Sequence, residues 1–272
     1  MGKKSGVCKL TGKSGTFVDC HIVPKALTYS NKKHHRGSEA RFVDIGPKGP
    51  KLAHSSWYDQ SLVTQEGENI LSEIDNRGID VLRRHGLVEY LPTTYNLKSE
   101  HIVRLDTNEK KALQVFFDSI LWRAAESKMA QYEEVELLTE QKELLRNSIL
   151  GVQQLHFKDF PKSTMVLSNL EEKVNVAPCR ENGSSSLSFV VDGRSCAFDC
   201  FSFYMNGLFV RSGISQNHSL LFEGLKCRSL GYSSELNVNV EDYRTYLKPR
   251  IDHDKQFIED KFPERLSRIL AT

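Results

Sequence analysis

The residues best suited to do chemistry lie within the first 25 positions. Cys8 opens a glycine-containing stretch that leads to Phe17–Val23, which we predict to be a short β-strand. Pro24 should end this strand, because proline has no N–H to donate to a sheet. Asp19 and His21 are two residues apart and should therefore share one face of the strand. A neutral imidazole at the end of a strand can take a proton from water or bind a metal ion.

Positive charge is concentrated around this segment. Residues 1–51 contain 11 Lys and Arg against 3 Asp and Glu, a net charge of +8, whereas the whole chain carries only +2. A basic segment on a mildly acidic body can provide a local field for a polyanion. A solvated, lysine-rich surface is the alternative interpretation. We predict nucleic acid as the partner, with its phosphates held by Lys9, Lys13, Lys25, Lys32 and Lys33.

The order Cys8-x-x-Thr11-Gly, followed by His21-Ile-x-Pro24, resembles the opening of the HNH (ββα-metal) endonucleases. The resemblance implies that His21 is the general base on the water that attacks the scissile phosphate. It implies a divalent ion, Mg²⁺ or Mn²⁺, with Asp19 or acids between positions 59 and 75 helping to bind it. It also implies that Cys8 belongs to a structural zinc knuckle. The candidate metal ligands named on this basis are Cys8, Cys20 and His21.

Two residues of the family pattern are missing from this chain. The pattern continues with a histidine on the following helix, but residues 57–75 contain Asn69 and no histidine, and the next one is His85. Cys8 also lacks a Cys-x-x-Cys partner, because position 11 is threonine and position 5 is serine. An inactive HNH-like protein that binds nucleic acid, or an adaptor, is therefore the alternative to an endonuclease. A third hypothesis places a hydrolase or signalling site in the β-rich half, where no motif has recognised spacing.

The secondary-structure pattern predicts an α+β chain whose first region is an HNH-like, nucleic-acid-facing segment over residues 1–100. We expect one helical turn at 25–27, a strand at 41–45 and a turn at 46–50. A longer helix should run from about residue 65 to residue 85, with an interruption at 76–78. The first region should thus contain a ββα element with His21 at the end of its first strand.

The remaining chain should contain a helical scaffold over 101–155 and an antiparallel β-rich region over 156–272. Asp106 and Glu109 have the spacing of a capping box, and apolar residues follow them at helical spacing. Thr139 should cap a second helix that Gly151 ends. In the β-rich region, Asp192-Gly193 and Asn206-Gly207 are hairpin signals. The strands expected there are 187–191, 196–205 and 208–211, followed by a helix over 255–270.

The composition is that of a globular protein, with 39% hydrophobic and 26% charged residues. No run approaches the roughly 18 apolar residues needed to span a bilayer, and no apolar stretch follows Lys3 and Lys4 to form a secretory signal. Six cysteines in 272 residues do not look like a disulfide framework. We therefore expect a cytoplasmic protein with reduced thiols and no membrane partner. The resemblance alone implies a bacterial antiviral-defence or mobile-element system; protein partners and a homo-oligomer stay open.

Overall fold

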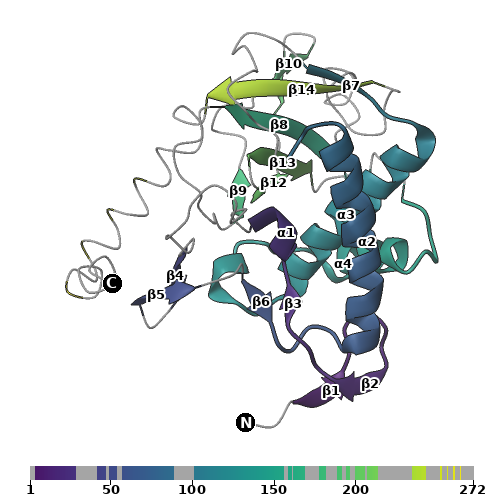
Figure 1. The fold of residues 1–272 in the computed structure, drawn as a ribbon, viewed down its shortest axis with the longest axis vertical. Coiled ribbons are helices and arrows are strands. Elements are labelled where there is room, and N and C mark those ends of the chain that lie inside the picture. Colours follow the sequence, from purple (N-terminus) through teal and green to yellow (C-terminus); the bar gives the residue numbers. More distant parts are fainter. Residues whose placement is uncertain are drawn as a thin grey trace.

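The computed structural model describes the chain in segments. In the first part these are residues 4–28, 42–46, 49–53, 57–88 and 101–155. Beyond them it describes 159–160, 162–168, 178–181, 189–191, 194–196, 200–205, 207–213 and 235–242, and the single positions 252, 256, 260 and 264. Helices and strands together form an α+β fold, with a six-stranded sheet at one end and the first hairpin at the other (Figure 1). One cluster of buried apolar side chains extends through all three regions, from Cys8 to Val238.

The segment around His21 is built from short strands. β1 (Ser5–Val7) and β2 (Ser14–Thr16) form an antiparallel hairpin. β3 (Cys20–His21) pairs antiparallel with β6 (Tyr58–Asp59), and α1 (Lys25–Thr28) follows as the expected helical turn. β4 (Phe42–Gly46) and β5 (Gly49–Ala53) form a second antiparallel pair. Of the turn predicted at 46–50, positions 46, 49 and 50 lie in these strands, and 47–48 lie outside the described residues.

The prediction of one strand over Phe17–Val23 is wrong, because only Cys20 and His21 lie in a strand. Phe17 instead makes a single bridge with Thr64, just before α2 (Gln65–Arg84). The partner segment bends between these two pairings, where the backbone N–H and the hydroxyl of Ser61 donate to the Asp59 carboxylate at 2.8 and 2.7 Å. An aspartate that accepts a hydrogen bond two residues on is a turn-forming arrangement, and here it interrupts the ladder.

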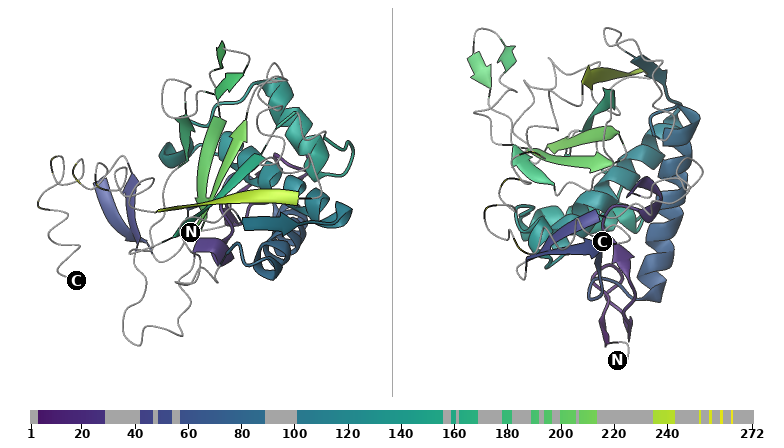
Figure 2. Two further views of the ribbon diagram at one scale, coloured as in Figure 1. Left: turned by 90° about the horizontal axis from the view of Figure 1, so that it is seen from above. Right: turned by 60° about the vertical axis from the view of Figure 1, so that its left-hand side comes forward.

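α2 runs from beside the β1–β2 hairpin toward the six-stranded sheet (Figures 1 and 2). The predicted break at residues 76–78 is wrong, because the helix continues through Gly78. Gly78 is buried against Phe116 of α3 (Thr107–Glu126); a β-carbon at this position would lie 2.3 Å from Phe116 Cγ. The glycine is thus a point of close helix–helix approach, and it lets α2 and α3 pack along their length.

Replacing Gly78 with alanine is expected to lower the free energy of unfolding by about 1–3 kcal/mol, since the added methyl group overpacks the contact with Phe116. This loss should appear although alanine is the better helix former by about 1 kcal/mol. Chemical denaturation measures it. Asn76→Ala is the matched control: this exposed residue of the same helix should gain about half a kcal/mol. A Gly78→Ala protein as stable as the control would contradict the packing argument.

The helical scaffold agrees closely with the sequence analysis. The Glu109 N–H donates to Asp106 Oδ1 at 2.8 Å, and the Asp106 N–H donates to Glu109 Oε2 at 3.1 Å, so the capping box before α3 is confirmed. The six apolar residues at helical spacing are all buried: Leu113, Phe116, Phe117, Ile120, Leu121 and Ala124. α4 (Thr139–Ile149) begins at Thr139 itself, so the N-cap residue is Leu138 and the prediction that Thr139 caps this helix is wrong. A 3₁₀ turn, η1 (Ala130–Tyr132), lies between the two helices, and Gly151 follows α4 with a φ of 70°.

The C-terminal region forms a mixed sheet, which β7 joins from the start of the 101–155 region that was predicted to be helical. Its strands stand in the order β7 (His101–Arg104), β14 (Glu235–Asp242), β8 (Lys162–Ser168), β13 (Leu208–Gly213), β12 (Cys200–Met205) and β9 (Cys179–Glu181). All pairs are antiparallel except β14 with β8, which is parallel. The expected antiparallel arrangement is therefore confirmed for most of the sheet, and the parallel pair is a correction.

Both hairpin signals in this region are confirmed. β12 and β13 pair at Met205 and Leu208, and Gly207 has the positive φ of 92° that such a turn requires. β10 (Phe189–Val191) and β11 (Arg194–Cys196) form the other hairpin. Of the strand expected over 196–205, Cys196 belongs to β11 and Cys200–Met205 form β12, while 197–199 lie outside the described residues. The described positions 256, 260 and 264 are helical, as expected. Within the described residues, no helix combines the length and the apolarity needed to cross a bilayer.

Candidate functional site

His21 lies where several elements meet. It is the last residue of β3, which pairs with β6, and α2 follows β6 to complete a strand–strand–helix arrangement. Across the ladder, the Tyr58 ring lies 5.5 Å from the imidazole, centroid to centroid, with the planes tilted by 50°. The His21 carbonyl oxygen accepts a hydrogen bond from Arg123 Nη1 at 2.9 Å. The backbone position of His21 is thus set by the ladder on one side and by α3 on the other.

The His21 imidazole is suited to accept a proton. Burial lowers its pKa, the positive charges of Lys25 and Arg123 lower it further, and Asp19 and Asp75 oppose this only in part. The ring is therefore neutral at pH 7. Its Nε2 is buried and has no hydrogen-bond partner among the described residues. Buried polar atoms are nearly always paired, so an unpaired one indicates a position for a ligand atom or a water molecule.

A buried ion pair lies directly behind His21. Arg123 of α3 is 1% exposed, and its guanidinium binds both carboxylate oxygens of Asp75 from α2, at 2.9 and 2.7 Å. It also donates to the backbone carbonyl and the hydroxyl of Ser119, at 3.2 and 3.1 Å. Together with its bond to the His21 carbonyl, these contacts join β3, α2 and α3. Bidentate arginine–carboxylate pairs of this kind fix geometry as well as contributing energy.

Glu68, in the first turn of α2, is the second unusual group of the site. Burial raises the pKa of its carboxyl group, and Arg123 offsets this only in part. Its side chain is hydrogen-bonded to the Cys20 thiol, whose own pKa burial raises well above the ordinary value. Cys20 is therefore a neutral thiol that donates to Glu68. Glu68 Oε2 is buried and lacks a partner among the described residues, as does His21 Nε2.

Cys8 occupies a different environment. Its sulfur accepts a hydrogen bond from the Thr11 N–H at 3.4 Å, and a β-carbon on Gly67 would lie 2.8 Å from it. Burial acts to raise the pKa of Cys8, but hydrogen bonds to Thr11 and Thr64 outweigh it and leave the pKa below its usual value. These neighbours supply no thiolate, imidazole or carboxylate, so the residues around Cys8 do not fit a four-ligand zinc site.

The three candidate metal ligands do not converge. Cys8 packs on the start of α2, Cys20 faces Glu68, and His21 faces Tyr58. In the part of the chain that the structure describes, no three His, Cys, Asp or Glu side chains are grouped to hold a metal ion. Cys8, Cys20 and His21 are therefore not brought together as one ligand set.

The candidate phosphate-binding lysines lie in different environments. Lys9 donates to the Glu126 carbonyl and forms an ion pair with its carboxylate at 3.0 Å, and Lys13 pairs with Glu66 at 2.6 Å. Lys25, on α1, is exposed and close enough to His21 to lower the pKa of the imidazole. Lys32 and Lys33 lie outside the described residues. Among the described candidate lysines, Lys25 is the one whose charge acts on His21.

Asp19 is brought close to both unusual groups. It precedes β3, is exposed, and accepts a hydrogen bond from Gln60 Nε2 at 2.8 Å. Its charge raises the pKa of His21 and that of Glu68.

The sequence analysis named the acids of α2 only as a group of possible metal ligands, and it did not identify Arg123 as a residue of the site. A signal for Arg123 was present, because it falls on the buried face of α3 at helical spacing from Phe116 and Ile120.

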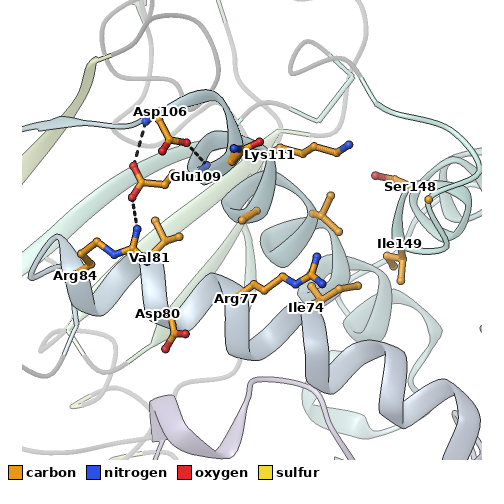
Figure 3. A pocket seen from close by; sticks show the side chains of 14 residues that line it. Ile74, Arg77, Asp80, Val81, Arg84, Asp106, Glu109, Lys111, Ser148 and Ile149 are labelled. Carbon is orange, nitrogen blue, oxygen red and sulfur yellow. Dashed lines mark hydrogen bonds and ion pairs between the residues drawn. The ribbon is translucent and has the colours of Figure 1, made fainter.

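A separate pocket of about 640 Å³ lies between α2, the start of α3 and the end of α4 (Figure 3). Its charged residues have both signs: Arg77 and Lys111 are cationic, Asp80 and Asp106 are anionic, and Arg84 is paired with Glu109 at 2.7 Å. None of the residues that surround His21 lines this pocket. Its mixed charge favours no particular class of ligand.

Comparison with known proteins found no matching family model, no matching curated protein and no matching solved structure. The function is therefore inferred from the residues and their geometry.

Proposed function

We propose that this protein is a metal-dependent endonuclease of the HNH type, in which β3, β6 and α2 form the ββα element. The observation that carries the proposal is His21: a neutral imidazole with an unpartnered, buried Nε2 at the end of the first strand. The reaction is hydrolysis of a phosphodiester bond in nucleic acid. An effector role in bacterial antiviral defence or in a mobile-element system, inside the cytoplasm, is the setting that goes with this activity.

In this mechanism His21 accepts a proton from the water that attacks the phosphorus atom. Its lowered pKa keeps the imidazole in the basic form at neutral pH. Arg123 acts through the backbone, because its bond to the His21 carbonyl holds the end of β3 in place. Lys25, beside the imidazole, is positioned to attract the phosphate.

The acids Glu68 and Asp19 fit a Mg²⁺ or Mn²⁺ ion better than a zinc ion. Such ions prefer one or two carboxylates together with water and phosphate oxygens. Glu68 has a buried oxygen without a partner, and Asp19 is exposed within electrostatic range of it. These two carboxylates would hold the ion, which when bound stabilises the charge that develops on the phosphate and the leaving oxygen.

The test is a cleavage assay with the purified protein on single-stranded DNA, duplex DNA and RNA. We expect cleavage with added Mg²⁺ or Mn²⁺ and none with a chelator. Glu68→Gln should raise the Mn²⁺ concentration needed for half-maximal cleavage, whereas Glu66→Gln, on the exposed pair with Lys13, should not. A protein that cuts none of the three substrates with either ion would contradict the proposal.

A protein that binds nucleic acid without cutting it is the second candidate. It is favoured by the side chains that α2 presents toward β3, which include Glu68 and Asp75 but no histidine. This candidate predicts binding that weakens steeply with salt, because lysine contacts to phosphates release counterions, and no turnover with any divalent ion. Equal binding at low and high salt would count against it.

A further inference from the structure

Tyr58 is an exposed aromatic residue beside the candidate site. Among the described residues, five large hydrophobic side chains are exposed: Val7, Tyr58, Ile102, Leu138 and Val152. Tyr58 is 40% exposed and is the member of this group that contacts His21, with 5.5 Å between the ring centroids. The other four are elsewhere: Val7 in β1, Ile102 in β7, and Leu138 and Val152 just outside the two ends of α4. An accessible ring is therefore held next to the group assigned to the chemistry.

The β3–β6 ladder determines which way this ring faces. Successive residues of a strand point to opposite sides. Asp59, the other residue of β6, is buried, while Tyr58 faces outward beside His21. Trp57, just before the strand, is half-buried and packs edge-on against Tyr132, at 5.9 Å between ring centroids. The pairing of His21 with Tyr58 fixes the two rings relative to each other. Tyr58 thus forms a preformed aromatic platform that folding leaves open to solvent.

We propose that Tyr58 stacks on a nucleobase next to the phosphate on which His21 acts, and that the site therefore takes single-stranded or unpaired nucleic acid. This inference rests on the proposed function, which puts a phosphate at His21. An unpaired base can leave its stack and offer its face to an aromatic side chain, whereas the bases of a duplex are already stacked on one another. The neighbouring cation Lys25 suits the adjacent phosphate, so the surface combines the two features that single-strand binding uses.

The experiment measures the binding of a fluorescently labelled 20-nucleotide single strand, and of the same sequence as a duplex, in chelator so that nothing is cut. We expect the wild-type protein to bind the single strand more tightly. Tyr58→Ala should weaken single-strand binding by about 5- to 100-fold, the range seen when a stacking aromatic is lost. Tyr58→Phe keeps the ring and should stay within about twofold of wild type, and so should Val152→Ala, which removes exposed apolar atoms elsewhere.

Three results with the binding-competent protein would overturn the inference. These are a preference for the duplex, a loss in Tyr58→Ala that is equal for single strand and duplex, and a Tyr58→Phe protein as weak as Tyr58→Ala. Absence of binding by the wild-type protein would do so as well. Circular dichroism melting of each variant shows that the fold is retained. Because this readout is binding alone, it is independent of cleavage: a protein that never cuts nucleic acid refutes the proposed endonuclease without deciding whether Tyr58 stacks.

Discussion

A His21→Ala protein is expected to cleave nucleic acid about 10²- to 10⁴-fold more slowly than the wild type, the contribution that a positioned general base makes to a reaction. The substitution removes the imidazole and its ring contact with Tyr58. It leaves the backbone bonds of β3 to β6, and the bond from Arg123 to the carbonyl of residue 21. Folding and nucleic-acid binding should therefore change little while the chemical step slows.

The single-turnover rate at saturating Mn²⁺ measures this effect, with the affinity for the substrate determined separately in chelator. His85→Ala is the matched control. His85 is also a partly buried histidine, but it follows the last residue of α2, beside Glu109. Its loss should leave the rate within about threefold of wild type, since no general base has been removed. If the His21→Ala and His85→Ala proteins cut at the same rate, His21 is not the base.

The parts of the fold that were predicted correctly depend on local signals. The capping box of Asp106 and Glu109 needs only residues three apart, and the apolar face of α3 needs only helical spacing. The Asn206-Gly207 turn, likewise, is specified by the conformation that Gly207 can adopt. These features are determined within a few residues of chain, so they can be recognised without knowing what packs against them. His21 itself was found in this way.

The parts that were missed depend on contacts between distant segments. Gly78 was interpreted as a helix breaker because its role is set by Phe116, 38 positions along the chain. The strand over 17–23 was predicted too long because the bend at Asp59, in the partner segment, decides where pairing stops. Lys9 was assigned to phosphate binding, whereas its partner Glu126 is 117 residues away. A single sequence does not show which distant residues will contact one another.

The arrangement behind His21 is the clearest case of this limit. Arg123 stands in the apolar face of α3, where a charged residue is stable only if a partner meets it. The partner, Asp75, is on α2 and is supplied by the same helix pairing that Gly78 permits. The close approach of α2 and α3 therefore does two things at once. It buries the core, and it places a guanidinium where it can hold the end of β3.

Replacing Arg123 with methionine is expected to lower the free energy of unfolding by about 3–5 kcal/mol, the cost of breaking a buried ion pair from one side. The substitution leaves the largely buried Asp75 carboxylate without its bidentate partner. It also removes the hydrogen bonds that Arg123 donates to the carbonyl oxygens of His21 and Ser119. Urea denaturation measures the loss. Lys13→Ala, which breaks the exposed pair with Glu66, is the comparison and should cost less than about 1 kcal/mol.

The double variant Arg123→Met, Asp75→Leu separates stability from positioning. With both charges removed, much of the lost stability should return, because apolar residues can replace a buried pair with little net cost. The bond from Arg123 to the His21 carbonyl does not return, so cleavage by the double variant should stay below that of the wild type. A double variant restored in both stability and cleavage would show that Arg123 serves only to neutralise Asp75. Recovery of stability without cleavage would show that it also holds His21 in place.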